Sequence, residues 1–245
     1  MTNGGSSSPT RVASNAQTKV SFIVPVYNEE RNVIEVIQRL KKLPLKKEII
    51  VVDDGSYDST PQLLKQFAGD PEVVIHLSQL NFGKGTAVRV GLKYATGDIV
   101  AIQDGDLEYD VNDYLKIIAK FSDPQVSVVY GSRFIYQPDS PLIWRYWMGN
   151  RLLRFLANFL YRANITDEAT AYKAFRREVI CNLPLSCKRF EFCPEVTAKL
   201  RKRGYVIHEV PIRYNPRSIA EGKKIRMKDG VISVWTLVRL WFSQG

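Results

Sequence analysis

Short β-branched runs alternate with stretches of helical periodicity along residues 20–130 of this chain. Five of these runs predict buried strands, at residues 20–26, 48–52, 73–77, 99–102 and 126–130. Between them, residues 28–43 carry apolar side chains three and four positions apart, and residues 83–94 and 112–121 also predict helices. This alternation is typical of an α/β domain with helices on both faces of a mostly parallel sheet.

Polar or glycine-rich motifs follow all five predicted strands. They lie at residues 25–29, 53–54, 81–85, 104–108 and 131–133. Parallel sheets bind their ligands beyond the carboxyl ends of the strands, which share one edge. Five such motifs predict a binding site at that edge more strongly than any one of them does.

Two aspartates follow the fourth predicted strand. Asp104 and Asp106 are two residues apart, and Glu108 comes two residues later. Residues i and i+2 of a strand point to the same face, so we expect the two aspartate carboxylates to lie together. Mg²⁺ or Mn²⁺ would relieve their repulsion and leave coordination positions for phosphate oxygens. The pattern suggests a metal–diphosphate site, although Asp-x-Asp is also common in turns and helix caps.

The formal net charge of +10 favours anionic partners, which include phosphates, nucleic acid and acidic membrane surfaces.

The three cysteines lack Cys-x-x-Cys spacing, which argues against a structural zinc site and favours free thiols in a reducing compartment. Residues 1–18 are polar, lack the apolar core of a signal peptide, and are expected to form a disordered tail. No apolar run reaches 18 residues, so no transmembrane helix is predicted.

The second half of the chain is aromatic and basic. Residues 144–161 interleave arginines with Trp, Tyr and Phe, which is typical of a membrane-interfacial helix and also of an amphipathic core helix. Residues 191–203 predict a helix, residues 205–214 a late strand, and residues 231–242 an apolar helix too short to span a bilayer.

Together these motifs resemble glycosyltransferase family 2, the inverting nucleotide-sugar enzymes of the GT-A fold. The matching segments are IVPVYNEE at 23–30, VVDDGSYDST at 51–60, NFGKGTA at 81–87, DGDLE at 104–108 and GSR at 131–133. TDEATAYKAFRRE at 166–178 and VPIRYNPR at 210–217 are similar to the dolichyl-phosphate mannosyltransferase-like branch, which uses polyprenyl phosphate.

The resemblance implies a Rossmann-like GT-A domain over residues 19–228, in which residues 142–162 form an amphipathic, interfacial segment. Residues 229–245 would form an apolar C-terminal helix. The resemblance also implies that Asp104, Asp106 and Glu108 hold Mg²⁺ or Mn²⁺, although Asp or Gln is commoner than Glu at the position of Glu108.

The resemblance further implies a nucleotide pocket. Tyr27 would lie alongside the base, Asp53 would accept hydrogen bonds from base or ribose, and Lys84 would reach the base or a phosphate from a loop between two glycines. The predicted nucleotide-binding set is Pro25, Tyr27, Asn28, Glu29, Asp53, Asp54, Lys84, Asp104 and Gly105. The residues alone also allow Glu29 to be a charge at a helix N-terminus and Asp54 to belong to a turn.

A lipid phosphate needs positioning more than a general base, because its second pKa is about 6 and it is mostly anionic at neutral pH. Guanidinium forks match phosphate geometry. The candidate acceptor-phosphate ligands are Arg133, Arg151, Arg213 and Lys224. Asp167 would orient a cationic group or the acceptor, and the predicted catalytic set is Asp104, Asp106, Arg133 and Asp167.

The resemblance implies transfer of a hexose to polyprenyl phosphate, with mannose from GDP-mannose as the first choice and glucose from UDP-glucose as the second. The expected location is the cytoplasmic membrane face, held peripherally or through a membrane-anchoring partner. A nicotinamide enzyme is disfavoured because no Gly-x-Gly-x-x-Gly follows the first strand. We expect no nucleic-acid partner, since the acids at the strand ends would repel it. A non-catalytic basic module stays open as an alternative.

Overall fold

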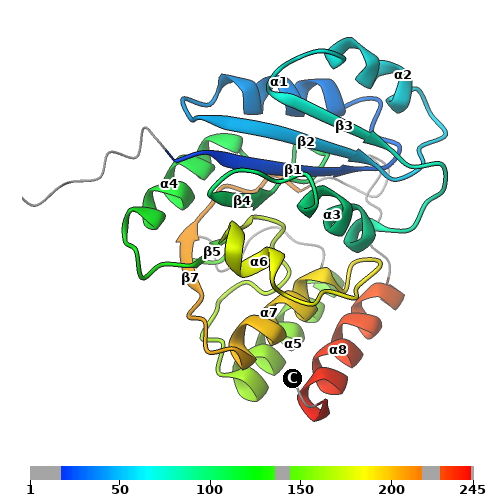
Figure 1. Cartoon of the computed structure of the whole chain (residues 1–245). Helices are drawn as coiled ribbons and strands as arrows, with labels where there is room; N and C mark the ends of the chain where they lie inside the picture. The colour runs from blue at the N-terminus through cyan, green and yellow to red at the C-terminus, as the bar shows by residue number, and fades with distance from the viewer. Residues whose placement is uncertain (1–17, 136–143, 217–226, 244–245) are drawn as a thin grey trace, which may run out of the picture.

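The computed structural model describes residues 18–135, 144–216 and 227–243. A seven-stranded sheet in the order β3-β2-β1-β4-β6-β5-β7 forms the centre of the molecule (Figure 1). Among these strands β6 runs antiparallel to both of its neighbours, so the sheet is mostly parallel, as predicted. The strands are β1 Val20–Val26, β2 Lys47–Asp53, β3 Val73–Leu77, β4 Ile99–Ile102, β5 Val128–Ser132, β6 Lys173–Arg176 and β7 His208–Pro211.

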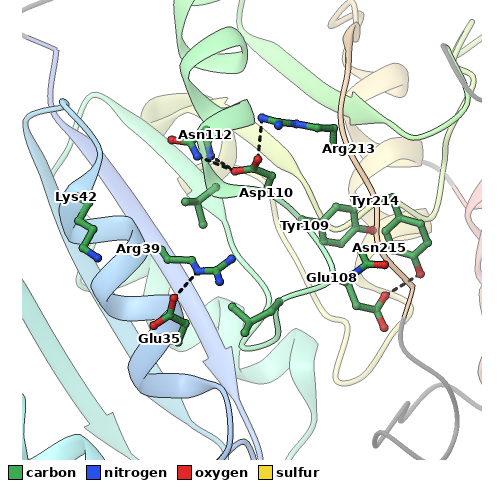
Figure 2. A pocket seen from close by; sticks show the side chains of 12 residues that line it. Glu35, Arg39, Lys42, Glu108, Tyr109, Asp110, Asn112, Arg213, Tyr214 and Asn215 are labelled. Atoms are coloured by element: carbon green, nitrogen blue, oxygen red, sulfur yellow. Dashed lines mark hydrogen bonds and ion pairs between the residues drawn. The ribbon is translucent and has the colours of Figure 1, made fainter.

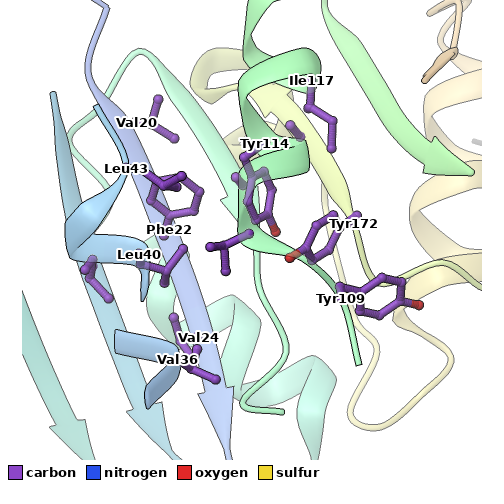
Figure 3. Close-up of a cluster of buried hydrophobic side chains, with 14 of the residues drawn as sticks. Val20, Phe22, Val24, Val36, Leu40, Leu43, Tyr109, Tyr114, Ile117 and Tyr172 are labelled. Carbon is purple, nitrogen blue, oxygen red and sulfur yellow. The ribbon is translucent and has the colours of Figure 1, made fainter. Parts of the chain in front are cut away.

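Helices cover both faces of the sheet (Figure 1). Along β1, Phe22 and Val24 pack on one side and Ile23 on the other, in two separate hydrophobic clusters. The first cluster, shown in part in Figure 3, lies beneath α1 Val33–Lys42, α2 Thr60–Leu64 and α4 Tyr114–Ala119. The second lies beneath α3 Lys84–Leu92, α6 Arg177–Cys181 and α7 Phe192–Lys202. Three single-turn 3₁₀ segments adjoin these helices, η2 Lys65–Phe67, η3 Val111–Asp113 and η4 Lys120–Ser122.

Three helices form a third, smaller cluster at the edge of the molecule. The long helix α5 Trp144–Tyr161 and the C-terminal helix α8 Met227–Phe242 pack with α7 through Leu153, Ala198 and Leu237. The Tyr161 hydroxyl donates a hydrogen bond to the Leu237 carbonyl over 2.6 Å, which ties α5 to α8. Of the helices that the structure describes, none has the length and hydropathy to cross a bilayer.

Two predicted elements are shorter than expected. The first helix begins at Val33, because Asn28 has a φ of 49° and the residues before Val33 form a loop. The late strand predicted at 205–214 spans His208–Pro211, since Tyr205 donates its backbone N–H to Leu200 at the end of α7. The predicted tail up to residue 17 and the candidate Lys224 lie outside the described residues.

Candidate active site

The reversed direction of β6 brings a distant segment to the edge where the parallel strands end. The residues just before β6 start at the edge where its neighbours β4 and β5 finish. Asp167 precedes β6, and Arg133 follows β5. Residues 104–108, called the acidic loop below, follow β4. The predicted catalytic residues Asp104, Asp106, Arg133 and Asp167 thus come from one edge of the sheet.

The acidic loop begins after the end of β4. The strand finishes at Ile102, so Asp104 and Asp106 lie outside it, and the expectation that strand pleating aligns their carboxylates does not hold. Gly105 between them packs against the end of β1, where an added Cβ would lie 2.8 Å from Cγ1 of Val26. Glycine at this position lets the acidic loop approach the first strand closely.

Lys84 places a positive charge beside the acidic loop. Its ammonium group forms an ion pair with the carboxylate of Asp104, and 18% of the Lys84 side chain is exposed. Burial, the largest influence, would lower the pKa of Lys84, but the neighbouring acidic groups led by Asp104 together raise it, so the group stays protonated. Lys84 is the first residue of α3 and not part of a loop, which corrects the prediction.

The carboxylate of Glu108 is directed to an aromatic residue. Its Oε2 accepts a hydrogen bond from the hydroxyl of Tyr214 over 2.7 Å, as Figure 2 shows. The backbone N–H of Glu108 in turn donates to Oδ1 of Asp106 over 3.1 Å. Within the described residues no three acidic, cysteine or histidine side chains gather into a metal cluster.

The two aspartates nevertheless fit a divalent cation. Asp104 and Asp106 are partly exposed carboxylates, the hard oxygen donors that Mg²⁺ and Mn²⁺ prefer. The Lys84 ion pair demonstrates that a positive charge is accommodated beside Asp104. The roles of Asp104, Asp106 and Glu108 as metal ligands stay predictions.

The loop after β1 is fastened to the loop after β2. The side-chain oxygen of Asn28 accepts the backbone N–H of Tyr57 over 3.0 Å, and the ring of Tyr27 meets that of Tyr57 edge-on. The backbone N–H of Glu29 donates to Oγ1 of Thr60 over 2.9 Å. These contacts tie the predicted nucleotide-binding residues after β1 to the segment that follows β2, and Pro25 lies within β1.

Two buried aspartates lie at the end of β2, Asp53 as its last residue and Asp54 just after it, and they organise the backbone around them. Asp53 accepts hydrogen bonds from the backbone N–H and the hydroxyl of Ser56. Asp54 accepts the backbone N–H groups of Phe82 over 2.9 Å and Gly83 over 2.7 Å, which fixes the loop before α3. Burial is the largest influence on both carboxyls and raises the pKa of each.

Arg133 and Asp167 form a buried bidentate ion pair. Nε of Arg133 lies 2.6 Å from Oδ2 of Asp167, and Nη2 lies 2.7 Å from Oδ1. The backbone N–H of Arg133 donates to the same carboxylate over 3.1 Å. Burial, the largest influence, would lower the pKa of Arg133, but Asp167 together with Tyr109 and Tyr214 raises it well above its ordinary value. Asp167 therefore orients a cationic group, which is the first of the two roles predicted for it.

Sequence patterns did not point to the residues that support this pair. Glu209 of β7 accepts the backbone N–H groups of Thr166 over 2.7 Å and Asp167 over 3.1 Å. The amide of Asn150 in α5 lies 3.4 Å from Asp167, and the guanidinium carbon of Arg133 lies 5.0 Å from the ring centre of Tyr214. Glu209 lies outside every motif, and Tyr214 lies within VPIRYNPR without a predicted role, so the spatial arrangement is what identifies them.

The other predicted acceptor ligands are not gathered around Arg133. The guanidinium of Arg213 pairs with Asp110 over 2.7 Å and lines a pocket of about 530 Å³ beside α1, which Glu108 and Tyr214 line as well (Figure 2). Arg151 is exposed on α5, and Lys224 lies outside the described residues. Of the described candidates, Arg133 is the one that Asp167 holds at the sheet edge.

Solved structures share this architecture. The chain aligns with glucosyl-3-phosphoglycerate synthase from Mycobacterium tuberculosis, crystallised with Mn²⁺, uridine diphosphate and phosphoglyceric acid, at a TM-score of 0.73 and 18% identity over 94% of this chain and 81% of that chain. A second mycobacterial protein aligns at a TM-score of 0.71 and 21% identity over 94% of this chain and 76% of that one. The chain therefore has the predicted GT-A-like α/β fold.

Sequence comparison gives the family. The undecaprenyl-phosphate 4-deoxy-4-formamido-L-arabinose transferase of Enterobacter sp. (strain 638) is 28% identical over 211 residues, which cover 84% of this chain. The aligned region spans 62% of the length of that relative. The model of the family described as "Glycosyl transferase family 2" matches residues 21–183, well over half of the sequence. This chain belongs to glycosyl transferase family 2.

Proposed function

We propose that this protein transfers a sugar from a nucleotide sugar to a polyprenyl phosphate with inversion at the anomeric carbon. The observation that carries the proposal is the joint position of a carboxylate pair and a buried, oriented arginine at one edge of the sheet. The carboxylate pair is suited to a divalent cation with its bound diphosphate, and the arginine is suited to an anionic acceptor. The relative from Enterobacter, named for transfer that involves undecaprenyl phosphate, supports this acceptor class.

On the donor side, Asp104 and Asp106 would hold Mg²⁺ or Mn²⁺. The bound cation would neutralise charge on the leaving nucleoside diphosphate. Lys84, already paired with Asp104, would add a second positive charge near the phosphates. The solved structures of the fold that contain Mn²⁺ with uridine diphosphate support the use of a divalent cation.

On the acceptor side, no general base is required. A phosphate oxygen of the lipid forms the new bond to the anomeric carbon while the bond from that carbon to the nucleoside diphosphate breaks. The acceptor oxygen is already anionic at neutral pH, so no proton has to leave it. Arg133 would bind this phosphate, and Asp167 would keep the guanidinium fork in one orientation.

The donor sugar is the finer part of the proposal. Mannose from GDP-mannose is our first choice and glucose from UDP-glucose the second. The dolichyl-phosphate mannosyltransferase-like motifs at residues 166–178 and 210–217 favour mannose. Uridine diphosphate in a solved structure of the same fold is the specific observation that favours glucose.

The surface of α5 fits a protein that works on a lipid. Met148, Leu152, Phe155 and Phe159 recur every three or four residues and are exposed by 49%, 48%, 60% and 71%. The whole of α5 contains arginines and no acidic residue. An exposed apolar stripe with cations beside it is suited to the headgroup region of an anionic bilayer.

The C-terminal helix α8 supports the same assignment, because it exposes large apolar side chains while it buries polar ones. It buries Ser233 and Thr236, which are 5% and 4% exposed, while Val231, Trp235 and Phe242 are 68%, 62% and 80% exposed. Its acidic residue is buried, and its exposed charges are basic. We propose that α5 and α8 rest on the membrane peripherally, on the cytoplasmic face or through a membrane-anchoring partner.

A thermal-shift titration tests the donor half of this proposal. GDP, UDP, GDP-mannose and UDP-glucose are each added with and without Mn²⁺. A ligand that binds only the folded state raises the melting temperature. We expect a Mn²⁺-dependent rise with one nucleotide family, which would also identify the base. No rise with any of the four ligands would contradict the proposal and favour a non-catalytic basic module.

A further inference from the structure

A column of aromatic rings leads from the hydrophobic core to the edge of the candidate site. Tyr114 stacks on Tyr172 with ring centres 4.3 Å apart, and Tyr172 stacks on Tyr109 at 4.6 Å (Figure 3). The ring of Tyr214 lies next, 5.2 Å from Tyr109. The rings of Tyr109, Tyr114 and Tyr172 are at most 5% exposed. The Tyr114 hydroxyl donates a hydrogen bond to the carbonyl of Ile102. Tyr214 therefore rests on a rigid support.

The ring of Tyr214 faces the arginine of the acceptor side. The guanidinium carbon of Arg133 lies 5.0 Å from the ring centre, within the range of a cation–π contact. Asp167 holds Nε and Nη2 of the same guanidinium. An ion pair with Asp167 and aromatic contacts with Tyr214 and with Phe134, whose ring centre is 5.5 Å away, thus define where the guanidinium lies.

The hydroxyl of Tyr214 faces the acidic loop of the donor side. It donates to Oε2 of Glu108 over 2.7 Å, and the backbone N–H of Asn215 donates to the carbonyl of Glu108 over 2.8 Å. Glu108 then donates its own backbone N–H to Oδ1 of Asp106 over 3.1 Å. The orientation of the Asp106 carboxylate therefore depends on a chain of hydrogen bonds that starts at residues 214 and 215.

We propose that Tyr214 is a positioning residue that sets the acceptor-side arginine and the donor-side aspartate at a fixed separation. Its ring acts through Arg133, and its hydroxyl acts through Glu108 on Asp106. In-line transfer needs the reacting groups held near their reaction distance, and small displacements are costly. This inference rests on the proposed function, because the terms donor side and acceptor side come from it. The contacts of Tyr214 with Arg133 and Glu108 do not depend on that function.

The hydroxyl and the ring can be removed separately. Tyr214→Phe removes the hydrogen bond to Glu108 and keeps the ring beside Arg133, whereas Tyr214→Leu removes both. Tyr94→Phe is the matched control, because it removes a tyrosine hydroxyl that lies 3.2 Å from Nδ1 of His76, outside the site. The full chain is used throughout.

Two measurements separate the two actions of Tyr214. The first is the Mn²⁺ concentration that gives half of the thermal shift with UDP or GDP, and the second is the KM for polyprenyl phosphate. For Tyr214→Phe we expect the Mn²⁺ midpoint to rise about tenfold, as for a lost bond to a charged group, with KM within about twofold. For Tyr214→Leu we expect both to rise by about tenfold. Tyr94→Phe should change neither.

A purely structural tyrosine would lower the melting temperature of both variants and leave the Mn²⁺ midpoint and KM at their wild-type values, which would overturn the proposal. Equal effects of Phe and Leu on KM would overturn the separate role of the ring. If the wild type makes no lipid-linked sugar, the proposed function fails, and the Mn²⁺ midpoint decides the role of Tyr214. If the wild type shows no Mn²⁺-dependent thermal shift, the proposed function and the positioning role of Tyr214 both fail.

Discussion

Single residues at the sheet edge differ in how firmly their surroundings fix them. Asp167 is completely buried and accepts three hydrogen bonds from Arg133, one from its backbone and two from its guanidinium. Removing one member of a buried pair leaves the other charge without compensation, which typically costs about 3–5 kcal/mol. Substitutions that keep the charge therefore report on function more cleanly than truncations do.

Arg133→Lys keeps the positive charge and loses the planar fork. We expect the KM for polyprenyl phosphate to rise about tenfold, because a point charge cannot hold Asp167 and a phosphate in the same bidentate geometry. Nucleotide affinity, measured by thermal shift, should stay at the wild-type value. Unchanged kinetics with the lipid phosphate would remove Arg133 from the acceptor site.

Asp104→Asn keeps the shape of the side chain and removes its charge. We expect most turnover to be lost, about a hundredfold or more, because Asp104 and Asp106 together would hold the cation. Circular dichroism and the melting temperature should show an intact fold, since Asp104 is partly exposed. An Asp104→Asn protein with near-normal activity would contradict the metal assignment.

Glu168 predicts a pH dependence of stability. It is completely buried, its Oε2 has no hydrogen-bond partner among the described residues, and burial raises the pKa of its carboxyl above the ordinary 4.5. Folding therefore opposes ionisation, and this cost grows as the pH rises above 4.5. Calorimetry should show that Glu168→Gln melts above the wild type at pH 8 and that the difference shrinks toward pH 4.5. A deficit of constant size at every pH would argue for a structural hydrogen bond instead.

Among the elements, the sequence was most informative where a strand is buried on both faces. β1 and β4 have the predicted limits because their apolar side chains are buried against helices on each side of the sheet, and the partly exposed edge strand β3 has its predicted limits as well. The direction of β6 could not be predicted from its four residues, since it depends on how α5 returns the chain to the sheet. Asp104 and Arg133 were found from strand ends, whereas Glu209 and Tyr214 depend on strand register, which the sequence does not reveal.

The exposed faces of α5 and α8 are the elements with the clearest test. Replacing Phe159 and Trp235 by Ser should reduce binding to vesicles of phosphatidylglycerol about tenfold or more in a sedimentation assay, because each removes a large apolar contact. Val206→Ser is the matched control, since Val206 is 60% exposed and lies outside both helices. Nucleotide-dependent thermal shifts should be the same in all variants.

Vesicles of phosphatidylcholine should bind the wild type more weakly than anionic vesicles do, because the exposed charges of the two helices are basic. If the Phe159 and Trp235 variants sediment with anionic vesicles as the wild type does, these faces are not the membrane-binding surface.

At the scale of the whole molecule, one sheet separates two cores and brings its loops to one edge (Figure 1). The acidic loop, the Arg133–Asp167 pair and Tyr214 meet at that edge through hydrogen bonds and a cation–π contact between residues far apart in sequence. The third cluster joins α5 and α8 to α7, and Asn150 of α5 contacts Asp167 directly. The helices proposed to rest on a membrane are thus physically connected to the acceptor side.

The measurement that tests the central claim most directly is sugar transfer in vesicles. Polyprenyl phosphate in anionic vesicles is incubated with Mn²⁺ and either GDP-mannose or UDP-glucose, and the lipid fraction is examined by mass spectrometry. The account predicts one lipid-linked hexose, released nucleoside diphosphate, and loss of both products in Asp104→Asn. No lipid product from either donor, with sugar transferred instead to a soluble phosphorylated acceptor such as 3-phosphoglycerate, would contradict it.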